Sequence, residues 1–399
     1  MSNAPSRDSQ AITLFLCGDV MTGRGIDQVL PHPGDPRIYE SYLKSAKGYV
    51  ELAEEVNGPI RKPVDFAYIW GDALDELRGR SPDARIINLE TAVTTSEEYW
   101  AGKGINYRMH PKNIPCITAA KIDCCVLANN HVLDWGYAGL AETLTTLVNA
   151  NLKTAGAGRD LAEAEAPAVI EVAGKGRVIV LGLGDVSSGI PWSWRARSDR
   201  PGVHLLADFS ETTVSQIATQ VAHLKRKNDV VVASIHWGGN WGYDVTDEHR
   251  NFAHRLIDRA QVDVVHGHSS HHPKGIELYK GKPILYGCGD FLNDYEGIAG
   301  YEEFRGDLTL MYFVTVEAAT GKLISLIMTP MQIRHFKLNY PQQRDVRWLQ
   351  QVLERESRAL GAERGQHGTG SPFSRPGSIG REDFSHPLAI FLSWREAPC

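Results

Sequence analysis

The sequence predicts an α/β fold with mixed sheets, and two patterns indicate it. Short apolar runs alternate with segments of helical spacing along most of the 399 residues, as in layered α/β proteins. Many of these runs are continuously apolar, which is typical of parallel strands buried on both faces. Further along the chain, apolar runs follow one another across tight turns and add antiparallel strands.

The first half of the chain contains three expected strands, each an apolar run: 12–18, 85–89 and 123–127. Apolar residues with helical spacing predict helices at 49–57, 70–79 and 137–151. Pro111 is compatible with the start of another helix over 111–120. Strands and helices therefore alternate in this half.

The second half opens with a strand pair, 168–172 and 178–183, joined by a Gly-Lys-Gly turn. Residues 185–201 carry Trp192 and Trp194 among polar residues, and we expect a surface loop there. An alternating unit of helix, strand and helix follows at 211–227, 230–236 and 247–260. The last expected strands are antiparallel and lie at 275–279, 283–286, 308–316 and 323–328.

The chain is longer than most single domains, but no Pro/Gly/Ser-rich linker interrupts its first 340 residues. We therefore expect one large domain with appendages. The expected segments are a polar N-terminal tail at 1–11, the domain at 12–335, a C-terminal helix at 336–360 and an irregular tail at 361–399. The last of these has the Gly, Ser, Arg and Pro content of disordered segments.

Composition excludes several classes of partner. The formal net charge of −6 comes from interspersed charges, and the sequence has no basic stripe with interleaved aromatics of the kind that binds nucleic acid. We therefore expect no nucleic-acid partner.

The cysteines indicate where the protein is located. The six cysteines form no CxxC pair, and most lie in or beside expected strands, which favours a reducing, cytoplasmic location. No signal peptide is expected, and no run approaches the ~20 apolar residues of a transmembrane segment. The sequence does not fix the oligomeric state.

Five apolar runs end in residues that bind metals. The residues at these ends are Asp19; Asn88 and Glu90; Asn130 and His131; His236; and His266, His268, His271 and His272. Ligands collect outside the carboxyl ends of parallel strands. The sequence therefore predicts a metal centre at one rim of a sheet.

The five signals differ in strength. Glu90 alone is also compatible with a helix cap, and His236 with a histidine bonded to a backbone carbonyl. Asn130 beside His131 supplies a hard ligand next to an acid or base, although an Asx turn gives the same pattern. The four histidines within residues 266–272 are the strongest signal, because buried imidazoles are costly without partners and binding a cation satisfies them together.

Taken in order, these motifs resemble the calcineurin-like metallophosphoesterase superfamily, and more narrowly its capsule-synthesis (CapA-like, poly-γ-glutamate) branch. The resemblance spans about residues 12–335 and rests on the segments 18–24, 88–90, 128–131, 236–238 and 275–291. It implies a four-layer α/β/β/α sandwich with mixed sheets and a metal centre at the strand ends.

The resemblance also implies a ligand set. Asp19, Glu90 in a bridging position, Asn130, His236, His268 and His271 would bind metal, and His131 would stand just outside as an acid or a stabiliser of charge. The superfamily's phosphatases carry a histidine two positions after the first aspartate, where this chain has Met21. We therefore expect one weakened position and one or two divalent ions from among Ca²⁺, Mg²⁺, Mn²⁺, Zn²⁺ and Fe²⁺.

Two enzymatic hypotheses use the same residues. In the first, the metals bind a phosphoryl oxygen and activate water while His131 protonates the leaving group, which is hydrolase-like chemistry on phosphate-ester or polyglutamate-type substrates. In the second, a metal acidifies a peptide Cα–H and two groups exchange its proton, as in the lasso-peptide epimerases of this fold, which the chain also resembles. The candidate catalytic groups are Asp19, His131, His271 and His272.

A third hypothesis is a non-catalytic module that binds an anionic polymer. Arg24, Lys103 and Arg108 would line its groove, although such charges lie more often in a solvated loop. Trp237 and Trp241 either wall a pocket for a peptide or pack in the core. The substrate is therefore a peptide, a polyglutamate or a phosphate ester on the sequence alone.

Overall fold

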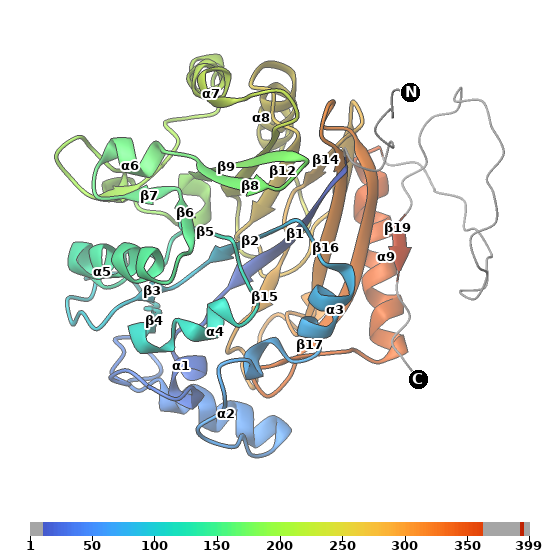
Figure 1. Cartoon of the computed structure of the whole chain (residues 1–399). Coiled ribbons are helices and arrows are strands. Elements are labelled where there is room, and N and C mark those ends of the chain that lie inside the picture. The colour runs from blue at the N-terminus through green and yellow to red at the C-terminus, as the bar shows by residue number, and fades with distance from the viewer. Residues whose placement is uncertain (1–10, 362–391, 395–399) are drawn as a thin grey trace.

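Two β-sheets pack face to face, and helices cover their outer faces (Figure 1). The structure, a computed structural model, describes residues 11–361 and 392–394. The predicted four-layer α/β/β/α sandwich with mixed sheets is therefore confirmed. Most of the predicted tails, at 1–11 and 361–399, lies outside the described residues.

The first sheet has the strand order β18-β17-β16-β1-β2-β5-β6, with β15 beside β1 and β19 beside β17. Its strands β1, β2, β5, β6 and β15 run parallel, and β16, β17 and β18 add antiparallel pairs. The bounds are β1 Ala11–Val20, β2 Ala84–Leu89, β5 Cys124–Val126, β6 Lys153–Ala155, β15 Asp290–Leu292, β16 Leu308–Glu317, β17 Leu323–Ile333, β18 Leu338–Asn339 and β19 Leu392–Trp394.

The second sheet has the order β13-β14-β12-β11-β9-β8, with a parallel centre and antiparallel edges. Its strands are β8 Ala168–Val172, β9 Gly176–Gly184, β11 Val230–His236, β12 Val264–His268, β13 Ile276–Tyr279 and β14 Lys282–Leu285. Two short pairs lie outside the main sheets: β3 Ala92–Val93 with β4 Arg108–Met109, and β7 Ala157–Gly158 with β10 Gly202–Val203.

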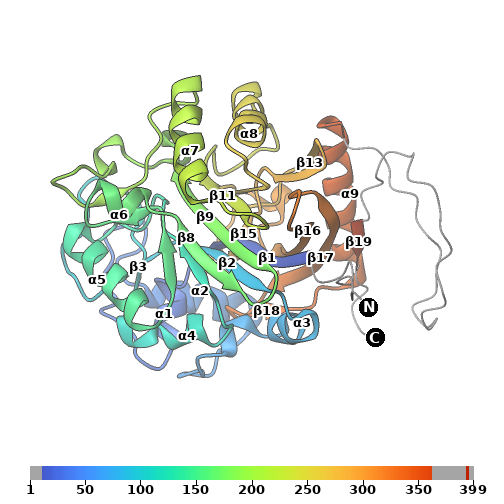
Figure 2. The same ribbon diagram turned by 45° about the horizontal axis from the view of Figure 1, so that its top comes forward.

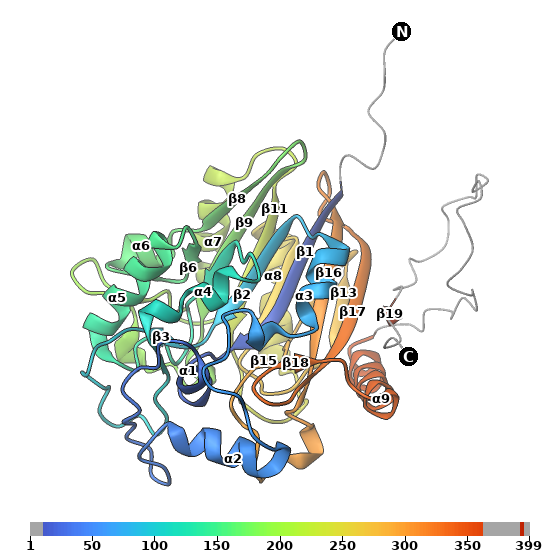
Figure 3. The same ribbon diagram turned by 60° about the horizontal axis from the view of Figure 1, so that its bottom comes forward.

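Helices α3, α4 and α5 pack on the outer face of the first sheet, whereas α7 and α8 pack on that of the second (Figure 2). Helix α9 lies at the β17 edge and buries Leu349 and Leu353 in the apolar layer between the sheets (Figure 3). The bounds are α1 Gly25–Val29, α2 Lys47–Asn57, α3 Ala73–Arg80, α4 Pro115–Thr118, α5 Gly136–Asn149, α6 Leu161–Glu165, α7 Glu211–Leu224, α8 Asp247–Arg259 and α9 Gln343–Ala359. Short 3₁₀ turns lie at Tyr68–Trp70, Pro111–Asn113, Val186–Ser188, Trp192–Trp194 and Glu302–Phe304.

Both faces of the central strands are buried, which explains their continuous apolar runs. On β1, Leu14 and Leu16 point into the layer between the sheets, and Phe15 and Cys17 point towards the helices. Successive side chains of a strand face opposite ways, so both faces need apolar residues. Five cysteines of the described chain are free and buried.

The structure differs from the predicted elements in three places. Residues 185–201 are not only a surface loop, because Trp194 is buried against the helices of the first sheet while Trp192 is exposed. The helix expected over 111–120 is a 3₁₀ turn followed by the short α4. The helix expected over 336–360 begins at Gln343, because the residues before it form β18 of the first sheet. We therefore propose that the segment 336–342 belongs to the main domain.

None of the helices in the described ranges is long and apolar enough to cross a bilayer.

Replacing Gly18 with Ala should disrupt the strand end that carries Asp19. A Cβ at this position would lie 1.6 Å from the carbonyl oxygen of Gly289, which is backbone and cannot move aside without displacing β15. We expect Gly18→Ala to lower the free energy of unfolding by about 3 kcal/mol or more, measured by urea denaturation. Gly79→Ala is the control, because nothing lies near its Cβ on α3 and it should stabilise by about 1 kcal/mol. Equal stability of Gly18→Ala and the wild type would contradict the strand contact.

Candidate metal centre

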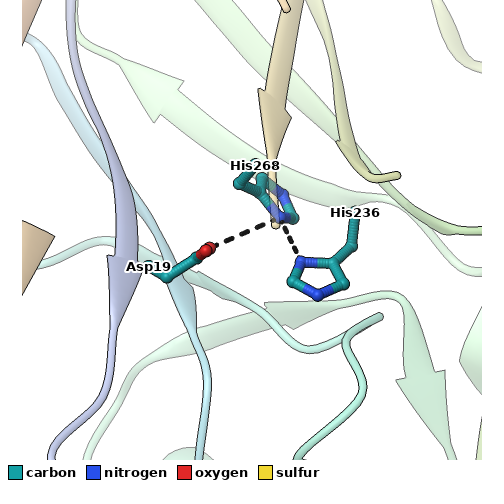
Figure 4. A group of neighbouring side chains, drawn as sticks. All are labelled: Asp19, His236 and His268. Carbon is teal, nitrogen blue, oxygen red and sulfur yellow. Dashed lines mark hydrogen bonds and ion pairs between the residues drawn. The ribbon is translucent and has the colours of Figure 1, made fainter. Parts of the chain in front are cut away.

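The predicted ligands come from both sheets. Asp19 lies at the end of β1 in the first sheet, and His236 and His268 end the neighbouring strands β11 and β12 of the second, where they are paired in register. Because the sheets pack face to face, these side chains meet between them (Figure 4). The rim predicted from the sequence is therefore the meeting place of two sheets.

Three of these side chains form a compact donor set. The Nδ1 atoms of His236 and His268 are 2.8 Å apart, and Nδ1 of His268 is 3.7 Å from Oδ1 of Asp19. One ligand atom from each residue lies within 4.8 Å of the others, and all three side chains are fully buried. Two imidazole nitrogens and a carboxylate at this spacing suit a divalent transition metal.

Asn88 ties the two predicted carboxylate ligands together. Its Nδ2 donates to Oδ1 of Asp19 at 2.7 Å and to Oε2 of Glu90 at 3.2 Å. Its own Oδ1 accepts from Nδ2 of Asn129 at 3.0 Å. Asn129 thereby fixes the direction of the Asn88 amide, and Asn88 fixes the distance between the carboxylates.

A second donor set surrounds Glu90. Nε2 of His236 is 3.1 Å from Oδ1 of Asn130 and 3.9 Å from Oε1 of Glu90. His236 thus presents Nδ1 to the first set and Nε2 to the second. A neutral imidazole has one unprotonated nitrogen, so His236 can coordinate an ion on one side only.

The electrostatics of the cluster favour a cation. Burial and the neighbouring Asp290 raise the pKa of Asp19, and burial and Asp19 raise that of Glu90. Burial lowers the pKa of both His236 and His268. A divalent ion would favour ionised carboxylates and neutral imidazoles at once, so these residues fit a metal.

His131 forms a dyad with Asp134 beside Glu90. Nδ1 of His131 is 2.6 Å from Oδ2 of Asp134, and Nε2 is 3.8 Å from Oε1 of Glu90. Nζ of Lys103 is 2.9 Å from the other Asp134 oxygen, and burial lowers the pKa of His131 to about 4. With Asp134 accepting the Nδ1 proton, the unprotonated Nε2 faces the cluster.

A second dyad joins His271 and Asp290. Nδ1 of His271 is 2.8 Å from Oδ1 of Asp290, whose other oxygen accepts from Nδ2 of Asn293 at 2.7 Å. Burial opposes protonation of His271, but Asp290 outweighs it and raises the pKa. Asp290 lies opposite Asp19 in the β1–β15 register, so this dyad adjoins the metal cluster.

The other two histidines of the motif lie elsewhere. His272 packs against the rings of Trp241, Tyr243 and Phe304, and within the described residues no hydrogen bond or ion pair joins it to the cluster, so the structure does not support a catalytic role for it. Nε2 of His266 is 2.7 Å from the carbonyl oxygen of Cys17 and links the two sheets.

Of the residues predicted to bind substrate, two lie near the site and three are held inside the protein. Arg24 and Arg108 are buried and bonded within the protein, Arg24 to Asp294 and Glu40, and Trp237 is buried in the core beneath α8. These three side chains are not free to meet a substrate. Lys103 adjoins His131, and Trp241 contacts the ring of His271, so these two remain near the site.

Asp134 and Asp290 are candidate functional residues that were not predicted from the sequence. Asp134 follows His131 by three residues, a spacing at which two side chains can pair across a turn. Asp290 follows the glycine of a Gly-Asp pair, as Asp19 does, and this repeated pattern was its only signal.

Comparison with known proteins identifies the family. The profile described as "Bacterial capsule synthesis protein PGA_cap" matches residues 13–295. The chain therefore belongs to the bacterial capsule synthesis family, as the motifs predicted.

Two relatives illustrate the range of this similarity. The chain is 50% identical over 351 residues to a "Probable polyglutamine synthesis accessory protein" of Mycobacterium tuberculosis (strain CDC 1551 / Oshkosh), covering 88% of this chain and 92% of the relative. It is 28% identical over 317 residues to "PGA biosynthesis protein CapA" of Bacillus subtilis (strain 168), covering 79% and 70%. In a comparison of structures, the chain is similar to a crystal structure described as a novel phosphatase from Mycoplasma pneumoniae, with 12% sequence identity, a TM-score of 0.42, and coverage of 81% of this chain and 94% of the other.

Replacing His268 with Ala should lower metal binding. Because the substitution removes one of three converging donors, we expect bound metal to fall several-fold after equilibration with Mn²⁺ or Zn²⁺ and gel filtration, measured by mass spectrometry of the element. His223→Ala on the exposed face of α7 is the control and should bind as the wild type does. Unchanged stoichiometry in a folded His268→Ala protein would refute the ligand assignment.

His272 should make the protein sensitive to acid. Burial lowers its pKa from 6.5 to about 4, so the unfolded chain takes up a proton between these values that the folded chain does not. Stability is therefore lost as the pH falls from 6.5 to 4, by up to about 3 kcal/mol from this group. We expect His272→Phe to remove this part of the loss, seen as a stability difference that grows between pH 7 and pH 4. If the free energies of unfolding of the two proteins changed in parallel with pH, the role of His272 would be contradicted.

Proposed function

We propose that this protein is a metal-dependent hydrolase that acts on a phosphate-ester or polyglutamate-type substrate during polymer synthesis. The observation that carries the proposal is the convergence of Asp19, His236 and His268 from two sheets into one buried donor set. The names of the relatives, which refer to polyglutamine synthesis and to PGA biosynthesis, support the substrate class.

The chain's own residues would hold and orient the reacting groups. Asp19, His236 and His268 would bind the ion, with Glu90 and Asn130 beside it. When bound, a divalent ion polarises the substrate and makes water a better nucleophile at neutral pH. Asn88 would keep Asp19 and Glu90 at a fixed separation through its two donated hydrogen bonds.

The two dyads suit opposite proton transfers. Burial favours the neutral ring of His131, and the opposite charges of Asp134 and Lys103 beside it offset one another, so Nε2 would accept a proton from water. Asp290 faces His271 with only the neutral Asn293 on its other oxygen, which favours the imidazolium, so His271 would protonate the leaving group. His131 is then the base rather than the acid expected from the sequence.

Activity should depend on both the metal and the base. We expect the metal-loaded full chain to cleave a general phosphodiester or a poly-γ-glutamate oligomer, to lose activity with EDTA, and to lose about 10²-fold or more in kcat in His131→Gln. His223→Ala should retain full activity. Absence of turnover on both substrate classes with metal bound would overturn the hydrolase proposal.

The same two dyads favour a second candidate, Cα epimerisation of a peptide. Two acid/base pairs on separate elements are what a two-base proton exchange requires. Incubation with peptides in D₂O distinguishes the two reactions, because epimerisation incorporates deuterium at Cα and hydrolysis does not. Cα deuteration without cleavage would replace the first proposal with the second.

A further inference from the structure

A cavity of about 400 Å³ borders the His271–Asp290 dyad. It is lined by the segment 293–307 after β15, by the end of β17, by the end of α2 and by Trp241. This volume is in the range of small-molecule sites. The lining includes no residue of the two dyads or of the metal cluster, so the cavity is a separate feature that adjoins the proposed reacting centre.

Three lining residues contact the dyad directly. The rings of Trp241 and Tyr295 lie 5.2 and 5.4 Å from that of His271, measured between centroids. Nδ2 of Asn293 donates to Asp290. A group bound in the cavity would therefore lie next to the part of the substrate on which His271 acts.

The walls of the cavity are largely apolar. Trp241 stacks on Tyr301 with centroids 4.1 Å apart and planes 7° from parallel. Val56, Ile298 and Tyr301 are among the few large hydrophobic side chains that are exposed in the described part of the chain, and all three line this cavity. Clustered exposed apolar side chains mark a binding surface.

The acidic residues of the lining are mostly satisfied. The carboxylate of Glu296 accepts from Asn57 and from the backbone N–H groups of His335 and Phe336. Asp307 accepts from Arg305 and Gln332.

The remaining charges are those of Arg334 and Glu302, and both residues are exposed. Glu302 accepts from the backbone N–H of Gly300. Over residues 11–361, the guanidinium of Arg334 has no carboxylate within ion-pair distance, so it is the cation that a ligand can use. The lining as a whole carries three carboxylates and two guanidinium groups, which disfavours a ligand with several negative charges.

We propose that this cavity binds an apolar acyl or aryl group that carries a single carboxylate, and that this group is the part of the substrate adjoining the reacting bond. The apolar body contacts Trp241 and Tyr301, and the carboxylate pairs with Arg334. The second half of the proposal rests on the proposed hydrolase function, whereas binding itself does not. The interior of a polyglutamate chain, charged at every residue, fits this lining poorly.

Calorimetric titration of the metal-free full chain tests the binding. The probe is N-(2-naphthoyl)glycine, compared with N-acetylglycine, which lacks the ring, and with 2-naphthamide, which lacks the carboxylate. We expect the probe to bind at least tenfold more tightly than either comparison compound, since both the apolar contact and the charged hydrogen bond are needed. Equal binding of 2-naphthamide would overturn recognition of the carboxylate, and equal binding of N-acetylglycine would overturn the apolar contact.

Variants locate the binding. Arg334→Gln and Tyr301→Ala, both at exposed positions, should each lower the affinity for the probe about tenfold. Glu302→Gln, which removes a nearby acid, should bind the probe as tightly as the wild type or more tightly. Unchanged affinity in both Arg334→Gln and Tyr301→Ala would place the probe elsewhere and refute the site. Because no metal or turnover is involved, failure of the hydrolase proposal and failure of this one give different results.

Discussion

Two sheets that share one buried layer force carboxylates of one strand end against imidazoles of another. Asp19 lies on β1, His236 and His268 lie on β11 and β12, and all three side chains are fully buried. Buried carboxylates and imidazoles are stable together only when hydrogen bonds or a cation compensate their lost hydration. Asn88, Asn129 and Ser269 supply part of that compensation through side-chain and backbone donors.

His236 lies between the two donor sets of the cluster and contacts both of them. Its Nδ1 lies 2.8 Å from Nδ1 of His268 and its Nε2 lies 3.1 Å from Oδ1 of Asn130, so the choice of tautomer selects which donor set is complete. Met21, at the position where phosphatases of the superfamily carry a histidine, follows Asp19 by two residues and supplies no imidazole. The two halves of the cluster are therefore unequal, and their difference originates in one residue just after β1 and in one ring of β11.

Much of this architecture is readable from the sequence, and the failures have physical causes. The apolar runs locate the strands because both faces of each are buried, and the residues after them predict Asp19, Glu90, Asn130, His236 and His268 as neighbours. Adjacent residues can face opposite ways, so the sequence cannot distinguish His271, beside Asp290, from His272, which packs among aromatic rings. The sequence around Trp237 does not reveal that its ring lies under α8, and Asp290 is found only once β15 is seen beside β1.

The contacts of Arg24 extend to both sides of the metal cluster. Its guanidinium binds Asp294 and Glu40 and lies 4.1 Å from the ring centroid of Tyr107, which in turn contacts His131. On the other side, Tyr295 follows Asp294 and contacts His271. One buried cation thus contacts the residues that support both dyads, so we expect substitutions near one dyad to be energetically coupled to the other and their effects not to add as independent contributions.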